Sequence, residues 1–339
     1  MASFTAVPEP VTEMKTLPAL LLLFIISPLV ASAGQVREYW VAAEPVEWDY
    51  APSGNLLHPG TEFKPWGART RYSKYRFIGY TDGSYQTPLK QPRWRGILGP
   101  ELRGEVGDTL KVHFRNRTEL PLSMHPHGLH YDEDNDGADH RGAGGIVSPG
   151  ASYTYTWQMD EGAGPGPTDP SSIVWLYHSH FDPVADINRG LIGTIVVTRK
   201  GMARGPDDPR PRDVDRAFTT LFLVFDEEDG AEGGLMHAMN GYIFGNLQGL
   251  EAVEGERVRW HLVALGSEVD LHTAHWHGET VLDHGRRTDV VELLPASMVS
   301  VDMVADNPGT WLYHCHVGDH ITAGMKTRWT VKPRQHAGN

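Results

Sequence analysis

Residues 311–325 read WLYHCHVGDHITAGM, and this stretch holds the only cysteine of the 339-residue chain, Cys315. The cysteine stands between His314 and His316. The aromatic residues before it predict the end of a strand, where successive side chains point to opposite faces of the sheet. Both histidines would then face one way and Cys315 the other. One strand could therefore contribute ligands to two metal sites, with the cysteine backbone as a short covalent bridge between them.

The residues after the cysteine add two further metal ligands. Two imidazoles, a thiolate and a weak axial thioether are the ligands of a blue-copper electron-transfer site. Cys315, His320 and Met325 supply three of these four. The second imidazole has to come from another part of the chain. Because there is no second cysteine, an intramolecular disulfide is excluded.

The same order of motifs occurs twice along the chain. The first set is GEVGDTLKVHFRN (104–116), HPHG (125–128) and WLYHSH (175–180). The second set is EGERVRWHLVALG (254–266), HWHG (275–278) and WLYHCH (311–316). Such a repeat predicts two homologous domains. We place them at residues 34–200 and 217–335, joined by a linker at 201–216 that is rich in Pro, Gly and charge, and followed by a tail at 336–339.

The pattern of apolar residues predicts an all-β fold. Short alternating runs are separated by Gly, Pro, Asn and Asp, and the chain contains 37 Gly and 24 Pro. Strands are expected at Leu110–Phe114, Tyr153–Trp157, Gly193–Val197, Phe218–Phe225 and Val299–Val304. No long stretch has the helical period. We predict β-sandwiches with Greek-key connections.

The net charge of the chain bears on its binding partners, and its N-terminal residues bear on its location in the cell. The net charge of −13 excludes nucleic acid as a natural partner, because no basic cluster stands against it. Lys15 precedes the apolar run Leu17–Val30, and Ala31-Ser32-Ala33 follows it. This order is typical of a signal peptide, and fourteen residues are too few for a spanning helix. We expect residues 1–33 to be an N-terminal extension and signal peptide, cleaved near Ala33, and the protein to be secreted or periplasmic; an uncleaved membrane anchor is the alternative.

Four His-x-His pairs are the strongest functional signal. On a strand, each pair puts two imidazoles on one face, where they can bind one metal cluster. A single pair arises by chance in many proteins, but four pairs in two repeated contexts beside the only cysteine do not. The pairs are His125/His127, His178/His180, His275/His277 and His314/His316.

These pairs, the H-C-H-x₃-H-x₄-M block and the H-x-x-H-x-H block at 272–277 resemble the multicopper oxidases, and with two domains the chain resembles a two-domain, or small, laccase. The resemblance covers residues 35–335 and implies two cupredoxin-like Greek-key β-sandwich domains in tandem. It also implies four coppers per chain. The type 1 copper would be held by His272, Cys315, His320 and Met325. The type 2 copper would take His125 and His275, and the type 3 pair would take His127, His178, His180, His277, His314 and His316.

The resemblance further implies a laccase reaction. Phenols or aromatic amines would give up electrons one at a time at an exposed imidazole edge of the type 1 site, and dioxygen would be reduced to water at the trinuclear site. Asp136 would deliver protons to that site, Asp289 would be a second carboxylate beside it, and Tyr131 would lie next to it without being a ligand.

Ser179 stands where the second repeat has Cys315, so the first domain lacks a thiolate site. The resemblance implies that the cluster forms between domain 1 of one chain and domain 2 of its neighbour, which closes as a homotrimer.

Three alternatives stay open. A copper nitrite reductase would need its cysteine in the first domain and fewer cluster histidines. A metallo-oxidase acting on Cu(I), Fe(II) or Mn(II) often carries Met-rich inserts, whereas the 10 Met here are scattered. A non-enzymatic copper electron-transfer protein would have no use for eight paired histidines.

Overall fold

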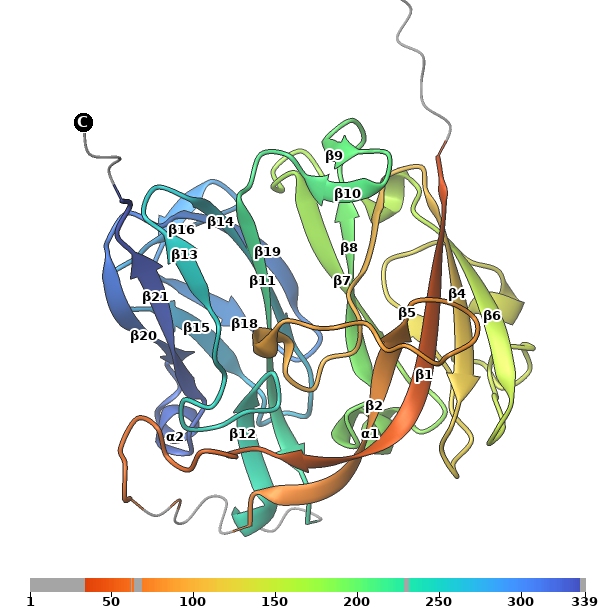
Figure 1. Ribbon diagram of the computed structural model, residues 1–339, viewed down its shortest axis with the longest axis horizontal. Helices are drawn as coiled ribbons and strands as arrows, with labels where there is room; N and C mark the ends of the chain where they lie inside the picture. Colours follow the sequence, from red (N-terminus) through yellow and green to blue (C-terminus); the bar gives the residue numbers. More distant parts are fainter. Residues whose placement is uncertain (1–33, 62, 64–68, 229–231, 336–339) are drawn as a thin grey trace, which may run out of the picture. The chain divides into compact units, whose positions relative to one another are not determined.

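Short strands, gathered into four main sheets, build the described part of the chain (Figure 1). The structure is a computed structural model and describes residues 34–61, 63, 69–228 and 232–335. The predicted extension, signal peptide and tail therefore lie outside the described residues. Among the described residues no helix is long and apolar enough to cross a membrane.

Residues 36–198 form two four-stranded sheets. The first has the order β2-β1-β4-β6 and consists of β1 (Val36–Asp49), β2 (Arg71–Tyr80), β4 (Thr109–Asn116) and β6 (Ser152–Gln158). The second has the order β3-β8-β7-β5 and consists of β3 (Leu102–Glu105), β5 (His125–Pro126), β7 (Ser172–His178) and β8 (Ile192–Thr198). On β4, Leu110, Val112 and Phe114 are fully buried, as their alternation with polar residues predicts.

Residues 216–332 form two larger sheets. One has the order β12-β11-β14-β19-β16-β17, with β11 (Arg216–Asp226), β12 (Leu235–Met239), β14 (Arg257–Ala264), β16 (Val281–Asp283), β17 (Arg286–Thr288) and β19 (Met298–Val304). The other has the order β13-β21-β20-β15-β18, with β13 (Glu251–Val253), β15 (His272–Trp276), β18 (Val290–Leu293), β20 (Gly309–Cys315) and β21 (Lys326–Lys332).

The sequence repeat reappears as a repeat of strand order. The order β2-β1-β4-β6 corresponds to β12-β11-β14-β19, and β3-β8-β7-β5 corresponds to β13-β21-β20-β15. In both halves the same pairs are parallel, β1 with β4 and β11 with β14, then β3 with β8 and β13 with β21. The all-β prediction is confirmed. The α-helices described are short, α1 (Pro183–Asn188) and α2 (Gly318–Thr322), and the 3₁₀ segments are η1 (Arg93–Arg95), η2 (Glu133–Asn135), η3 (Glu161–Ala163) and η4 (Glu232–Gly234).

The segment predicted as a linker has some structure of its own. Strands β9 (Ala203–Gly205) and β10 (Asp208–Pro211) pair antiparallel within it. Each half has its own apolar core, and a third apolar cluster contains side chains of both halves, among them Trp48, Leu176, Phe225 and Ile243. The two halves therefore share buried surface as well as a connection.

A glycine and a tryptophan bring the repeated motifs into contact in each half. Gly128, the last residue of HPHG, has φ +68°, and a Cβ placed there would lie 2.2 Å from the Trp175 ring. Gly278 has φ +73°, and its Cβ would lie 3.0 Å from the Trp311 ring. Glycine adopts a positive φ without strain, and its lack of a Cβ leaves room for the ring. The H-x-H-G and W-L-Y-H motifs thus pack on each other in both halves.

Candidate metal centres

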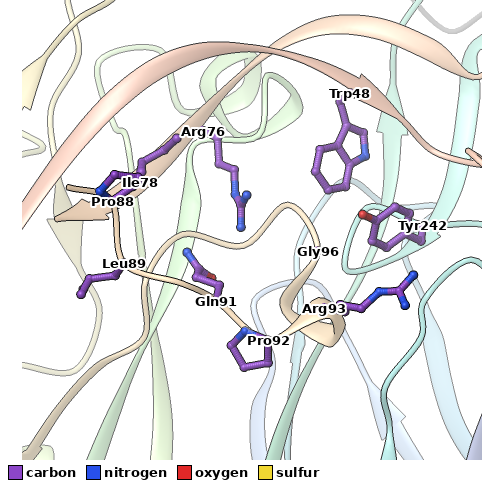
Figure 2. A pocket seen from close by; sticks show the side chains of 10 residues that line it. All are labelled: Trp48, Arg76, Ile78, Pro88, Leu89, Gln91, Pro92, Arg93, Gly96 and Tyr242. Atoms are coloured by element: carbon purple, nitrogen blue, oxygen red, sulfur yellow. The ribbon is translucent and has the colours of Figure 1, made fainter. Parts of the chain in front are cut away.

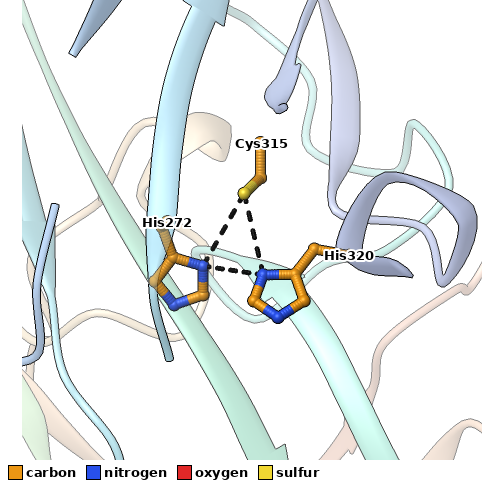
Figure 3. A group of neighbouring side chains, drawn as sticks. All are labelled: His272, Cys315 and His320. Atoms are coloured by element: carbon orange, nitrogen blue, oxygen red, sulfur yellow. Dashed lines mark hydrogen bonds between the residues drawn. The ribbon is translucent and has the colours of Figure 1, made fainter. Parts of the chain in front are cut away.

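A buried Cys-His-His group lies at the end of β20 (Figure 3). The Cys315 Sγ atom is 3.8 Å from Nδ1 of His272 and 3.7 Å from Nδ1 of His320, and these two nitrogens are 3.1 Å apart. His272 comes from β15, which pairs with β20, and His320 comes from α2. The Cys315 amide donates to the Met325 carbonyl over 3.0 Å, so Met325 is held beside the group, in the same core cluster.

The chemistry of this group fits a copper ion. Burial lowers the pKa of His320 to about 4, so its imidazole is neutral and can bind a metal. Burial also raises the pKa of the Cys315 thiol, which disfavours a bare thiolate. A bound metal cation would stabilise the thiolate directly. The three donor atoms converge on one point, as a soft metal site requires.

A buried carboxylate orients His272 from the far side of its ring. Asp270 is 1% exposed, and its Oδ1 atom is 3.3 Å from Nε2 of His272. The same carboxylate accepts hydrogen bonds from the amides of Val224 and Ser267, which fix its position. Nε2–H of His272 therefore donates to Asp270, and Nδ1 is free to face the cysteine. Sequence reasoning missed Asp270, although its D-x-H spacing was visible.

The expectation of an exposed imidazole edge at this site is wrong for the single chain. His272 is 1% exposed and His320 is 3% exposed. Both rings pack inside the second-half core because β12, β15 and α2 meet there. An electron donor in solution therefore reaches these rings only through neighbouring side chains.

The first two His-x-His pairs form one group. His125 on β5 pairs in register with His178 on β7. Nε2 of His127 is 3.0 Å from Nε2 of His178, and the His125 and His180 rings are 5.1 Å apart. Burial lowers the pKa of His127 to about 4 and that of His178 to about 3.

The second two pairs repeat this geometry. His275 pairs with His314 across β15 and β20, and Nε2 of His277 is 3.1 Å from Nε2 of His314. The His275 and His316 rings stack at 5.1 Å. Burial lowers the pKa of His314 to about 4. His277 and His316 are exposed on the single chain.

Backbone carbonyls orient three of these imidazoles. Nδ1–H donates over 2.8 Å from His125 to the Asp136 carbonyl, from His178 to the Ser179 carbonyl, and from His314 to the Cys315 carbonyl. The remaining Nε2 lone pairs then face the other histidines of their group. Neutral imidazoles with converging lone pairs are suited to binding copper.

The two four-histidine groups do not merge. Among the residues that the structure describes, no set of three or more metal-binding side chains within 4.8 Å combines histidines from both groups. Each group supplies four of the eight imidazoles expected for a trinuclear copper site.

The predicted acidic residues lie beside these groups. The Asp136 Oδ1 atom is 3.2 Å from Nδ1 of His125, and the Tyr131 ring lies 6.0 Å from the His125 ring. Burial and the nearby Asp136 carboxylate raise the pKa of Tyr131. The Asp289 Oδ2 atom is 3.9 Å from Nε2 of His275. None of the three needs to bind a metal to act there.

In the first half a polar pair occupies the place of the thiolate site. The Ser179 hydroxyl donates to the Asp186 carboxylate over 2.6 Å, and both residues are buried. Asp186 lies on α1, as His320 lies on α2. Leu122 stands three residues before His125, as His272 stands before His275. The first half therefore lacks the donors of a blue-copper site, and Asp186 was not anticipated from the sequence.

Comparisons with known proteins identify the family to which the chain is related. Two family profiles described as multicopper oxidase match residues 95–201 and 225–335. Mouse hephaestin is 39% identical over 341 residues, covering 87% of this chain and 28% of its own length. Human ferroxidase HEPHL1 is 35% identical and human ceruloplasmin 34% identical, with 29% and 30% of their lengths covered. The chain thus spans less than a third of these relatives.

Solved structures show the same fold at lower identity. A crystal structure of a multicopper oxidase has a TM-score of 0.62 at 22% identity, covering 88% of this chain and 89% of that one. The blue copper oxidase from Nitrosomonas europaea has a TM-score of 0.61 at 20% identity, covering 88% and 86%. These matches agree with the predicted pair of cupredoxin-like domains. With both halves matched by its profiles, the chain belongs to the multicopper oxidase family.

Proposed function

We propose that this chain is a copper-dependent oxidase that removes single electrons from Fe(II) and reduces dioxygen to water. The observation that carries the choice of substrate is a third imidazole and a carboxylate beside the buried cysteine group. The His237 ring on β12 lies 5.0 Å from the His320 ring. Asp319 precedes His320, is exposed, and acts electrostatically on both of these histidines.

These side chains suit a small cation. A carboxylate and an imidazole are ordinary ligands of divalent iron, and the charge of −13 attracts cations to the protein. The His237 ring lies 5.0 Å from the His320 ring, and Nδ1 of His320 is 3.7 Å from the Cys315 Sγ atom, so an electron entering near His237 has a short route to Cys315. The relatives named ferroxidase support this substrate. Sequence reasoning missed His237 because a single histidine in MHAMNG matches no metal-binding spacing.

Copper would be held by the residues assigned above, four ions per chain, and would supply one-electron redox chemistry and oxygen reduction. The chain itself provides the geometry. Asp270 orients His272, and the Cys315 carbonyl orients His314. Cys315 is covalently flanked by His314 and His316 of the second histidine group, so the backbone links the two sites.

Replacing His237 by Ala is expected to raise the KM for Fe(II) at least about tenfold. A tenfold loss corresponds to about 1.4 kcal/mol of binding free energy, which we assign to one lost metal ligand. Steady-state oxygen uptake with Fe(II) measures it. The KM for 2,6-dimethoxyphenol should change little, and an unchanged visible spectrum confirms that His320 kept its place. Equal losses for both reductants would remove the Fe(II) proposal and leave His237 a purely structural role.

Phenol oxidation, the laccase reaction, is the second candidate. The apolar side chains of Leu271 and Leu294 are 51% and 64% exposed. They flank the register pair His272–Leu293, so they lie opposite each other at this end of the site. An aromatic reductant could dock there. A higher kcat/KM for 2,6-dimethoxyphenol than for Fe(II) would favour this function.

We infer that the working enzyme is a homotrimer. Each chain has two separate four-histidine groups, and the exposure of His277 and His316 leaves one group open to a neighbour's histidines. Three chains in a ring would complete three eight-histidine sites. Light scattering of the copper-loaded protein should give the mass of three chains. A monomer with full oxidase activity would contradict this arrangement.

We also infer that Asp136 supplies protons during oxygen reduction. Its carboxylate contacts His125 and acts on Tyr131. Asp136→Ala should slow oxygen uptake about a hundredfold or more while the blue absorbance stays, because general acid catalysis contributes about a hundredfold to ten-thousandfold. Unchanged turnover would leave Asp136 a positioning role only. Asp289, 59% exposed on the single chain, is proposed as the second carboxylate. We expect Asp289→Ala to slow oxygen uptake less than Asp136→Ala does. A larger effect of Asp289→Ala would mean that Asp289, and not Asp136, is the main proton donor.

Export remains a prediction from the sequence. N-terminal sequencing of the protein made in a secreting host should begin near Gly34, and an intact N-terminus would contradict cleavage.

A further inference from the structure

We propose that a cavity lined by Arg76, away from the metal centres, binds a small carboxylate anion with an apolar body. Figure 2 shows the cavity, and its volume is about 310 Å³. It is lined by Trp48, Arg76, Ile78, Pro88, Leu89, Gln91, Pro92, Arg93, Gly96 and Tyr242. None of these residues is among the predicted copper ligands or their acidic neighbours.

Arg76 is a cation without a counter-charge. The side chain rises from β2 and points into the cavity (Figure 2). Its Nη2 donates to the Leu98 carbonyl over 3.2 Å, while its Nε is buried without a hydrogen-bond partner. Within the described part of the chain no carboxylate forms an ion pair with it. A half-buried guanidinium normally has an anionic partner, because leaving it unpaired costs free energy.

The surrounding charges make this cavity more positive. Arg93 also lines the cavity, and no Asp or Glu is among the lining residues. Arg95, close to Arg76, already has a partner in Glu101 at 2.9 Å. Burial and the Arg95 charge lower the pKa of Arg76, which is the direction expected for an unpaired cation. An arginine stays charged in proteins, so a bound anion would stabilise the Arg76 guanidinium.

The remaining walls specify the rest of the ligand. The Trp48 and Tyr242 rings lie 5.0 Å apart, and Ile78, Pro88 and Leu89 add apolar surface. A fully hydrated phosphate would gain little from these walls. A flat or aliphatic carboxylate would pair with Arg76 through two parallel hydrogen bonds and bury its hydrocarbon part against the rings.

The cavity also spans the two halves. Trp48 belongs to β1, and Tyr242 follows β12. The Trp48 indole donates to the Gly241 carbonyl over 2.7 Å. An anion held between Arg76 and Tyr242 would therefore add contacts across this junction and stabilise the folded chain.

The experiment uses calorimetric titration of the copper-loaded full chain with sodium benzoate as the probe and neutral benzamide as the comparator. We expect benzoate to bind and to raise the Tm, and benzamide to bind at least about tenfold more weakly, because it lacks the charge that pairs with the Arg76 guanidinium. Arg76→Gln should weaken benzoate binding by a similar factor. Arg71→Gln is the matched control, because Arg71 lies on the same strand with its side chain 70% exposed. It should leave benzoate binding unchanged.

Three results would overturn the proposal. These are no heat with benzoate, equal affinity for benzoate and benzamide, and benzoate binding that survives Arg76→Gln. Inorganic phosphate displacing benzoate with equal affinity would overturn the apolar part of the assignment. If Arg76→Gln does not fold, Arg76→Lys tests the same point, because it keeps the charge and loses the paired hydrogen bonds, and its benzoate affinity should fall between wild type and background.

Discussion

Cys315→Ser is expected to abolish the blue absorbance and to lower oxidase turnover by on the order of a thousandfold, which corresponds to about 4 kcal/mol of lost barrier lowering. The reason is chemical, because a serine hydroxyl does not ionise where a metal-bound thiol does. The fold should survive, since the first half already carries a serine at this position. The blue visible absorbance, copper content and oxygen uptake measure the result, with copper expected to fall from four ions per chain to three.

Ser179→Cys is the matched control for this prediction. It should create no blue site, because the first half offers Leu122 and Asp186 where the second half offers His272 and His320. In place of Met325 it has the buried Leu191, whose carbonyl accepts from the Ser179 amide over 3.1 Å as the Met325 carbonyl accepts from the Cys315 amide. A Cys315→Ser protein with full turnover would contradict the assigned site. A blue first half in Ser179→Cys would show that the thiolate alone suffices.

Arg259→Ala is expected to lower the free energy of unfolding by about 3 kcal/mol, near the lower end for a broken buried ion pair because its carboxylate partners are partly solvated. Arg259 is fully buried and donates to both Asp302 oxygens at 2.7 and 2.8 Å. It also donates to the hydroxyls of Ser171 and Ser172 at 2.7 and 2.9 Å. These serines belong to the first half, so the substitution also removes one of the polar links between the halves.

The measurement is thermal and urea unfolding of the copper-free protein, so that metal binding does not add to stability. Arg216→Ala is the control, because the Arg216–Glu256 ion pair is 43% exposed at the arginine and should contribute less than about 1 kcal/mol. Equal losses in the two variants would mean that burial of Arg259 adds nothing. Reversible unfolding has to be checked first, since two packed halves need not unfold in one step.

Much of the fold and of the candidate site was open to prediction because it rests on local pattern. Alternation of apolar residues depends only on the two-residue period of a strand. The buried face of β4 could therefore be predicted from Leu110, Val112 and Phe114. The repeated motifs likewise indicated corresponding sheets in the two halves. The H-C-H block predicted that Cys315 and His314 face apart, and His314 does turn toward His277 while Cys315 turns toward His272.

The same local logic failed wherever a contact joined distant parts of the chain. Asp270 and His237 have no repeating pattern, and their roles arise only because β12, β15 and α2 meet around one ring pair. The prediction that the His272 or His320 imidazole edge is exposed was wrong for this reason. The packing of neighbouring elements decides whether an imidazole edge reaches solvent.

By itself, then, the sequence determined the ligand types, their spacing and the all-β repeat, because these follow from residue chemistry and the geometry of a single strand. Only the tertiary structure decided that the eight paired histidines form two separate groups of four, that Asp186 fills the place of a ligand in the first half, and that Arg76 lines a cavity without a carboxylate. Those outcomes depend on which strands become neighbours, and so on the free energy of packing the whole chain.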